Sequence, residues 1–571
     1  MNRFIPCRNA YCLVLLLMMI MVALFLTACS AGTGEVPMTE PQVRIDPSGD
    51  PAMYQAGNPS LYLTAIEEEP DTVDFQCTTI HYTIAQNVFD RLVEMENDQD
   101  QNAKILPSLA QSWEISDDRR TYTFHLREGV RFSNGSELTS SDVLYTFVRL
   151  LTHPDSCNRD IVDNITGADR LEMGETNQLE GFRVIDDLNF SITLEAPFEA
   201  FLACLSMPGA SILDAETTKE AGIRFGTDPE WTVGTGSFIL KEWVPGKGML
   251  LTANADCWQG APRCAGLDLR FLTDPEEIRL MFENGGLDIL NLDDVGRASE
   301  YFVHGDIYKD RLYSVQRIGM TYIALNESVA PLDDVRVRRA LQLALNKAIL
   351  LDVGYSGKGY VENGIMPHGL YGFNPDLNEI PCKADEAKKL LSEAGFPDGF
   401  SLTFSVSSAS SLSELAMIRA AVSMWEKIGV RAGVEIVSDS RFMELRKSGS
   451  LACYSATWTA DYNDPDNFFY TFFGNEENTR FRSLCYPREE IMERVRRART
   501  IADPDARIRE YRELERIIVQ EDAAWIPLFS RLYTYVPSKR LTGIGNSWNG
   551  SVKNRYRDMS VTGDADNDAA E

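Results

Sequence analysis

Residues 402–436, LTFSVSSASSLSELAMIRAAVSMWEKIGVRAGVEI, change hydrophobic period twice and decide the fold class. Apolar residues occupy every second place from Leu402 to Val406, which predicts a strand. Next comes a helical stripe of Leu415, Ile418, Val422 and Trp425. Ser413 is the expected N-cap and Gly429 the stop. Residues 430–436 predict a second strand. Strand, helix and strand in about 40 residues indicate a parallel pair with a right-handed crossover, and hence an α/β protein.

Two more helices and a β-rich region are expected elsewhere. Asp334 is a candidate cap for a helix with an apolar stripe from Val337 to Leu345, and Asp385 for a helix that ends at Gly395. Alternation over residues 122–126, YTFHL, predicts a strand, and Asn134-Gly135 predicts a turn.

The first 28 residues have the composition of a secretory signal. Arg3 and Arg8 precede an apolar run that reaches Leu26. The following Leu26-Thr27-Ala28-Cys29 resembles the lipobox of bacterial lipoproteins, in which the cysteine receives a diacylglycerol and becomes the mature N-terminus. The alternative is an uncleaved membrane anchor. We expect a signal peptide over 1–28, lipid on Cys29, and a location on the extracellular or periplasmic face of the cell membrane.

Composition bounds the rest of the chain. Residues 29–56 are rich in Pro and Gly and are expected to form a flexible leash, and residues 561–571 an acidic tail. The net charge is −30, and removal of a signal that holds only Arg3 and Arg8 makes it −32. Nucleic acid and anionic lipid headgroups are therefore not expected as ligands. The roughly 500 residues between leash and tail are enough for two or three lobes.

Cysteines and histidines indicate no metal site. No cysteine pair has the two-residue spacing of a zinc or redox motif, and the 5 histidines are scattered singly. Cys257 and Cys264 could close a short disulfide loop. No metal and no cofactor are expected.

Several sequence blocks occur in one order along the chain. They are Asn87–Leu92, Tyr122–Arg127, Val130–Gly135, Leu138–Val143, Val233–Phe238, Asp334–Leu341, Ala384–Gly399 and Trp458–Asp466. These blocks resemble the extracellular solute-binding proteins of the oligopeptide and dipeptide ABC importers, solute-binding protein family 5, in lipoprotein form. The resemblance covers nearly the whole mature length.

The resemblance implies a periplasmic-binding-protein-like type II fold, with two α/β lobes, a hinge and an accessory β-rich lobe. Residues 57–93, 212–309 and 521–560 would form the first lobe, 94–211 the accessory lobe and 310–520 the closing lobe. It also implies capture of peptides in an interlobe cleft, delivery to the membrane permease subunits of an ABC importer, and a monomer.

The resemblance also assigns two binding residues. The Asp of a Trp-x-x-Asp block binds the peptide's α-ammonium, and here it falls on Asp461; Trp458 would form a flat wall for a ligand side chain. Spacing alone favours a turn former or N-cap at Asp461, because DYNDP is rich in turn residues, and it leaves Trp458 open as a core residue.

The partner of the ligand carboxylate stays unassigned. Some oligopeptide binders have an Arg six residues before the amine-binding Asp, and this chain has Ser455 there. Arg441, Arg446 and Arg480 are available, but a solvated position is expected for each.

Other functions remain as alternatives. The same fold could bind a sugar oligomer, a metal chelate or haem, or act as a peptide sensor. No catalytic residue is expected, because the sequence has no nucleophile elbow, no His-Glu-x-x-His and no phosphate loop.

Overall fold

The computed structural model describes residues 62–78, 82–97 and 103–562. The expectations for residues 1–61, which include the signal, the leash and Cys29, and for residues 563–571 lie outside this part of the chain. Within it, no helix is both long and apolar enough to cross a membrane.

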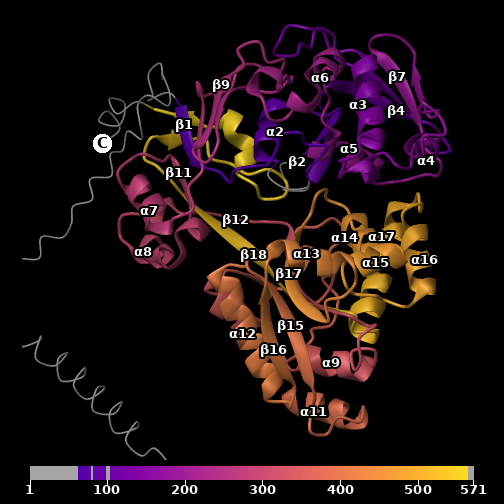
Figure 1. The fold of residues 1–571 in the computed structure, drawn as a ribbon, viewed down its shortest axis with the longest axis vertical. Coiled ribbons are helices and arrows are strands. Elements are labelled where there is room, and N and C mark those ends of the chain that lie inside the picture. The colour runs from indigo at the N-terminus through magenta and orange to yellow at the C-terminus, as the bar shows by residue number, and fades with distance from the viewer. Residues whose placement is uncertain (1–61, 79–81, 98–102, 563–571) are drawn as a thin grey trace, which may run out of the picture. The chain divides into compact units, whose positions relative to one another are not determined.

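A 12-stranded sheet organises the described residues (Figure 1). The strands of its main path are, in spatial order, β16 (Arg431–Val437), β15 (Ser401–Ser407), β17 (Cys453–Thr459), β13 (Gly319–Leu325), β18 (Trp525–Pro537), β11 (Ile289–Asn291), β1 (Tyr62–Ile66), β10 (Gly266–Arg270), β9 (Gly248–Ala253) and β8 (Phe238–Val244). Beside this path, β12 (Tyr313–Gln316) and β14 (Gly359–Val361) also pair with β18. We call β1 and β8 to β12 the first half of the sheet, and β13 to β17 the second half.

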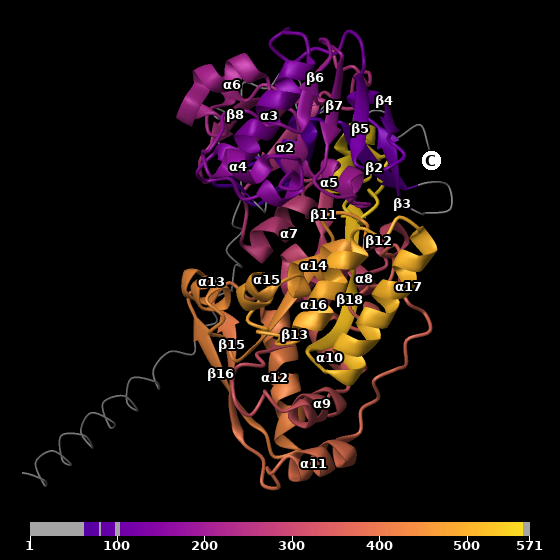
Figure 2. The ribbon, with the colours of Figure 1, turned by 90° about the vertical axis from the view of Figure 1, so that its right-hand side faces the viewer.

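Strand β18 belongs to both halves. Its residues Trp525–Phe529 pair with β13, whereas Leu532–Tyr535 pair with β12 and Tyr535–Pro537 with β11. Figure 2 shows β18 with β11 and β12 at one end and β13 at the other. The chain also passes from the first half to the second between β12 and β13. Two neighbouring segments of backbone therefore connect the halves, which is the arrangement of a hinge.

The predicted strand, helix and strand are confirmed. Strands β15 and β16 are parallel from Ser401 opposite Arg431 to Ser407 opposite Val437, and α12 (Leu412–Glu426) joins them. The expected N-cap was wrong by two residues. Ser411 is extended and its side chain accepts the N–H of Glu414, so the helix begins before Ser413.

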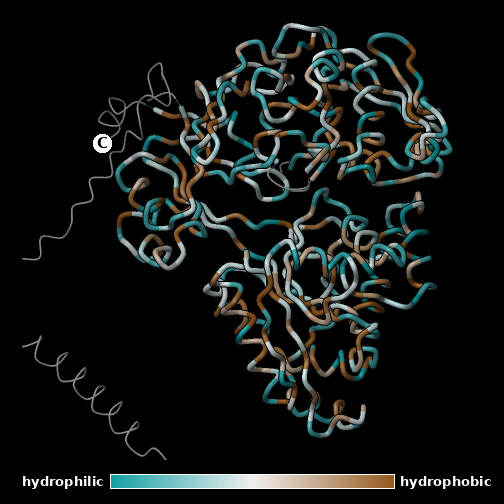
Figure 3. The backbone as a smooth tube through the Cα atoms, viewed as in Figure 1, coloured by the Kyte–Doolittle hydropathy of each residue, from teal (hydrophilic) through white to brown (hydrophobic). Residues whose placement is uncertain are grey.

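Alternating side chains of the second half supply two cores. Met320, Tyr322 and Ala324 of β13 face one core, whereas Ile323 and Leu325 face the other. The first core is covered by α13 (Asp439–Lys447), α14 (Asp466–Phe473), α16 (Glu489–Ala498) and α17 (Pro504–Glu515). The second is covered by α9 (Val335–Leu343), α10 (Lys347–Tyr355), α11 (Ala384–Glu393) and α12. Hydrophobic and hydrophilic stretches accordingly alternate along the chain (Figure 3).

The β-rich region is a separate antiparallel sheet. Its order is β4 (Ala110–Ile115), β5 (Thr121–Leu126), β7 (Asn189–Thr193) and β6 (Phe182–Val184). The strand predicted at 122–126 is confirmed, with Tyr122, Phe124 and Leu126 all buried. They join a core drawn almost entirely from residues 92–212.

Three local expectations have mixed outcomes. The side chain of Asp334 caps α9 by accepting the N–H of Arg336, as predicted. Asp385 is not the cap of α11, because the helix already begins at Ala384; the acid lies in the first turn, where the helix dipole favours it. Cys257 and Cys264 are buried free thiols, so the suggested disulfide is absent.

Trp425 offers a test of the second core. Its side chain is fully buried beside Phe404, and its Nε1 donates to the carbonyl of Leu341. Trp425→Ala should lower the free energy of unfolding by about 3–5 kcal/mol, because it leaves a cavity and an unpaired carbonyl. Urea denaturation followed by circular dichroism measures the loss. Val422→Ala, on a partly buried position of the same helix, is the control, and equal effects of the two variants would contradict this packing.

Candidate functional site

The segment that follows β17 carries both predicted binding residues. Trp458 lies near the end of the strand, and Asp461 begins the turn that leads into α14. Trp458 is partly buried, packs against the core under α13 to α17, and meets Phe472 edge to face at 5.5 Å between ring centroids. Asp461 is also partly buried.

Asn467, in the first turn of α14, joins the two residues. Its Oδ1 accepts from the Trp458 Nε1 and from the backbone N–H of Asp461, both at 3.1 Å. Its Nδ2 donates to Oδ2 of Asp461 at 3.1 Å. The Asn467 side-chain amide therefore fixes the position of the Trp458 indole relative to the Asp461 carboxylate.

Two buried ion pairs anchor this turn. Asp464 receives a two-pronged contact from Arg507, at 2.7 and 2.6 Å, and Asp466 lies 3.0 Å from Arg499. Breaking a buried pair typically costs about 3–5 kcal/mol, so the turn has little freedom to move. Asp464 and Asp466 thus support the turn.

The same turn contacts the β-rich region. The Tyr462 side chain packs into the core of that region, and the N–H of Asn463 lies 3.4 Å from Sδ of Met95. The guanidinium of Arg499 lies 4.3 Å from the Phe198 ring centroid. Asp461 therefore lies on a segment that faces a different lobe from its own.

Burial has the largest effect on the ionisation of Asp461. The pKa of Asp461 is raised from 3.8 to about 6, because burial and the Asp160 carboxylate raise it more than the Asn467 hydrogen bond and the Arg482 charge lower it. Burial and Asp160 likewise raise the pKa of Asp163 to about 7. A site that desolvates several carboxyl groups favours a cationic ligand group.

The three arginines that were considered as partners of the ligand carboxylate lie in different environments. Arg441 and Arg480 form ion pairs on their own helices with Glu444 and Glu477, as expected of surface residues. Arg446 is partly buried, and its Nε has no hydrogen-bond partner among the described residues.

Sequence reasoning missed two residues, Asn467 and Arg482. The guanidinium of Arg482 lies 4.5 Å from the Trp458 ring centroid. No periodicity or turn rule points to Arg482, because it lies on another segment and reaches Trp458 only in the folded chain. Asn467, six residues after Asp461, was within reach of a search for local side-chain partners.

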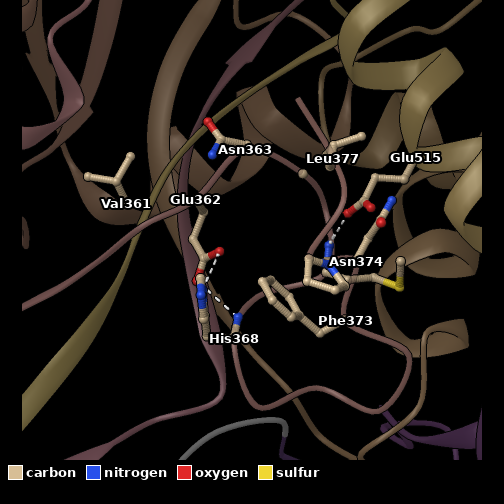
Figure 4. Close-up of a pocket in the computed structure, with 11 residues that line it drawn as sticks. Val361, Glu362, Asn363, His368, Phe373, Asn374, Leu377 and Glu515 are labelled. Carbon is tan, nitrogen blue, oxygen red and sulfur yellow. Dashed lines mark hydrogen bonds and ion pairs between the residues drawn. The ribbon is translucent and has the colours of Figure 1, made fainter. Parts of the chain in front are cut away.

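A cavity of about 250 Å³ lies in the second half of the structure, and Glu362 and Glu515 approach it from two sides (Figure 4). His368 contacts Glu362 at 2.9 Å, and burial raises the pKa of Glu515 to about 7. The loop that lines the cavity continues to Tyr371, whose N–H donates to Asn463 at 2.6 Å. The cavity thus adjoins the framework of the Asp461 turn. Among the described residues no group of histidine, cysteine or acidic side chains could hold a metal ion.

Two α/β lobes that share one long strand, with a β-rich lobe beside them, define a solute-binding protein with the periplasmic-binding-protein-like type II fold, as expected. A solved structure of the periplasmic binding protein DppA from Helicobacter pylori, in complex with the peptide STSA, superposes with a TM-score of 0.71 at 23% identity, covering 88% of this chain and 98% of that one.

Residues 104–480 match the family described as bacterial extracellular solute-binding proteins, family 5 middle, and the chain belongs to this family. It is a family of binding proteins that act outside the cell, not of enzymes. The heme-binding protein A of Haemophilus influenzae is 28% identical over 464 residues, which is 79% of this chain and 83% of that protein. The dipeptide-binding protein of Escherichia coli is 27% identical over 468 residues, with coverages of 78% and 84%.

The raised pKa of Asp461 predicts a pH-dependent cost to the ligand-free protein. Since the folded-state pKa of about 6 lies above the ordinary 3.8, the ionised carboxylate destabilises the fold above about pH 6, and this cost disappears as the pH falls toward 4. Asp461→Asn removes the charge and should raise the melting temperature near pH 8, with a smaller increment at each lower pH. Scanning calorimetry measures it. An increment that does not change with pH, or one equal to that of the exposed control Glu435→Gln, contradicts the assignment.

Proposed function

We propose that this chain captures peptides between its lobes by their amino terminus and delivers them to the permease subunits of an ABC importer. The observation that carries the proposal is Asp461, a desolvated carboxylate that forms no ion pair within the described residues. A buried carboxylate without a cation is costly, and a ligand ammonium supplies the missing charge. Every peptide with a free amino terminus offers that group.

The frame around Asp461 suits this role. Asn467 holds one carboxylate oxygen at 3.1 Å, so the carboxylate is oriented before the ligand arrives. Trp458, held by the same amide, offers an aromatic surface beside it. The dipeptide-binding relative supports a peptide ligand.

Haem is the competing ligand, because another relative is named for it. The carboxyl groups of Asp461 and Asp160 favour an ammonium, which a peptide offers at its amino terminus and haem lacks. Peptide is therefore the ligand class that the site supports best.

The lobe boundaries form part of this proposal. Residues 57–93, 212–309 and most of 521–560 would move as the first lobe, 94–211 as the accessory lobe and 310–520 as the closing lobe. Trp525–Phe529 pair with β13 and would move with the closing lobe, which corrects the boundary expected at 521. The sharing of β18 between both halves of the sheet supports such a hinge. Closure would trap the peptide against Asp461 and Trp458 in a monomeric protein.

We further propose that residues 1–28 are removed and that lipid on Cys29 anchors the mature protein at the membrane. The support is the sequence Leu26-Thr27-Ala28-Cys29 after an apolar run with a basic flank. Because the chain is strongly negative, its body is not attracted to anionic membrane lipids, and the lipid on Cys29 would provide the attachment.

The anchor is tested by Cys29→Ser. The wild type should partition with membranes and incorporate labelled fatty acid, and the variant should do neither, because the acylated thiol is lost. Fractionation of cells followed by immunoblotting measures the partition. A variant that stays as firmly bound as the wild type would show that the apolar segment itself is the anchor.

The amine role is tested by a double-mutant cycle with trialanine and N-acetyl-trialanine. Removing one partner of an enclosed charge pair costs about 2–5 kcal/mol, so Asp461→Ala should weaken trialanine binding roughly 30-fold to a few thousand-fold. N-acetylation removes the same interaction from the other side, so both changes together should cost much less than their sum.

Isothermal titration calorimetry on the four combinations gives the coupling. Glu435→Ala, an exposed acid on β16, is the matched control and should bind both peptides as the wild type does. Equal binding of trialanine and its acetylated form by the wild type would exclude the amine role. Tight binding of haem with no binding of trialanine would exclude the peptide class.

A further inference from the structure

Arg482 is a partly buried arginine without a carboxylate partner. It follows α15 (Glu476–Phe481), and it forms no ion pair with any described residue. Its guanidinium lies 4.5 Å from the ring centroid of Trp458 and 5.1 Å from that of Phe472. Burial lowers the pKa of Arg482, and the nearby charge of Arg446 lowers it further.

Three other arginines of the same lobe are buried or partly buried and are paired. Arg507 lies 2.6 Å from Asp464, Arg499 lies 3.0 Å from Asp466, and Arg338 lies 2.9 Å from Glu327. Desolvating a guanidinium is costly unless a carboxylate neutralises it. Arg482, like the partly buried Arg446, has no such carboxylate, and it lies next to the proposed binding residues.

The geometry leaves the hydrogen-bonding edge of Arg482 available. The Arg482 guanidinium contacts the rings of Trp458 and Phe472 through cation–π interactions. Its side chain forms no hydrogen bond with any described residue. A guanidinium has five N–H donors in its plane, which match the two oxygens of a carboxylate. The stacking therefore holds the group in place without using its donors.

Arg482 and Asp461 belong to one rigid frame. The Arg482 guanidinium contacts the indole of Trp458, the indole donates to Asn467, and Asn467 donates to Asp461. The two opposite charges also affect each other electrostatically. A carboxylate and an unpaired guanidinium that are held at a fixed separation are complementary to a zwitterionic ligand.

We propose that Arg482 receives a carboxylate of the ligand, so that the site selects short peptides that carry a carboxylate near the ammonium bound by Asp461. This inference rests on the proposed function and adds the ligand's second charge. The carboxylate is either the free C-terminus of a short peptide or an acidic side chain close to the amino end. Both sources present the same planar anion to the guanidinium.

The test compares trialanine, its C-terminal amide and the amide of Glu-Ala-Ala by calorimetry. A hydrogen-bonded charge contributes a factor of about 10 to 100 in affinity at a partly exposed site. The wild type should therefore bind trialanine about 10- to 100-fold more tightly than its amide. Recovery of affinity by the Glu-Ala-Ala amide would identify the side chain as an effective source, and no recovery would assign the site to the C-terminus.

Two variants separate ligand recognition from packing. Arg482→Met keeps a long side chain over the indole but loses the donors, so it should bind trialanine and its amide equally, at the level at which the wild type binds the amide. Arg482→Lys should keep part of the difference, because it keeps the charge but not the two-pronged geometry. Arg441→Met, an exposed arginine paired with Glu444, is the control and should keep the whole difference.

Acetylation distinguishes this inference from the proposed function. If N-acetyl-trialanine binds as well as trialanine while the preference for acid over amide depends on Arg482, the amine role fails and the carboxylate role stands. If the wild type binds acid and amide equally, or if Arg482→Met weakens both by the same factor, Arg482 only packs and the inference is overturned.

Discussion

Strand β18 belongs to both halves of the sheet, and this sharing constrains the rest of the structure. Its first residues pair with β13 and its last residues with β11 and β12, so neither half can be completed without it. A strand that is hydrogen-bonded on both sides bends more readily than it breaks, because each lost ladder bond leaves a buried polar group. Each half of the sheet has its own core and still depends on the shared strand.

The second feature of the molecule is that, in the turn after β17, two carboxylates are paired with arginines and one is not. Asp464 and Asp466 are paired with arginines, and these pairs fix the turn after β17. Asp461, in the same turn, is left with only a neutral amide partner. The paired residues thus support the turn, and Asp461 is the acid of this turn whose charge is left without a cation.

Relatives named for haem and for dipeptides are similar to this chain to nearly the same degree. Identity at this level therefore does not distinguish the ligand, and the choice depends on individual side chains. In the proposed site, the carboxylate of Asp461 would discriminate by charge, because a carboxylate attracts an ammonium and repels an anion. The unpaired guanidinium of Arg482, beside Trp458, adds a second charge of opposite sign. In the proposed site, the two charges together would restrict the choice of ligand more than either charge alone.

The sequence by itself determined the α/β class, the strand, helix and strand at 402–436, the β-rich segment and the family, because each depends on local periodicity or on short blocks of adjacent residues. It was less exact about helix starts, as Ser411 and Asp385 show, because several polar residues near a helix end compete for the cap. Only the tertiary structure decided that Asp464 meets Arg507, that Tyr462 enters the core of another lobe and that Arg482 stacks on Trp458. These contacts join residues far apart in the chain, and their formation depends on how strands and helices pack and not on any period within a single segment.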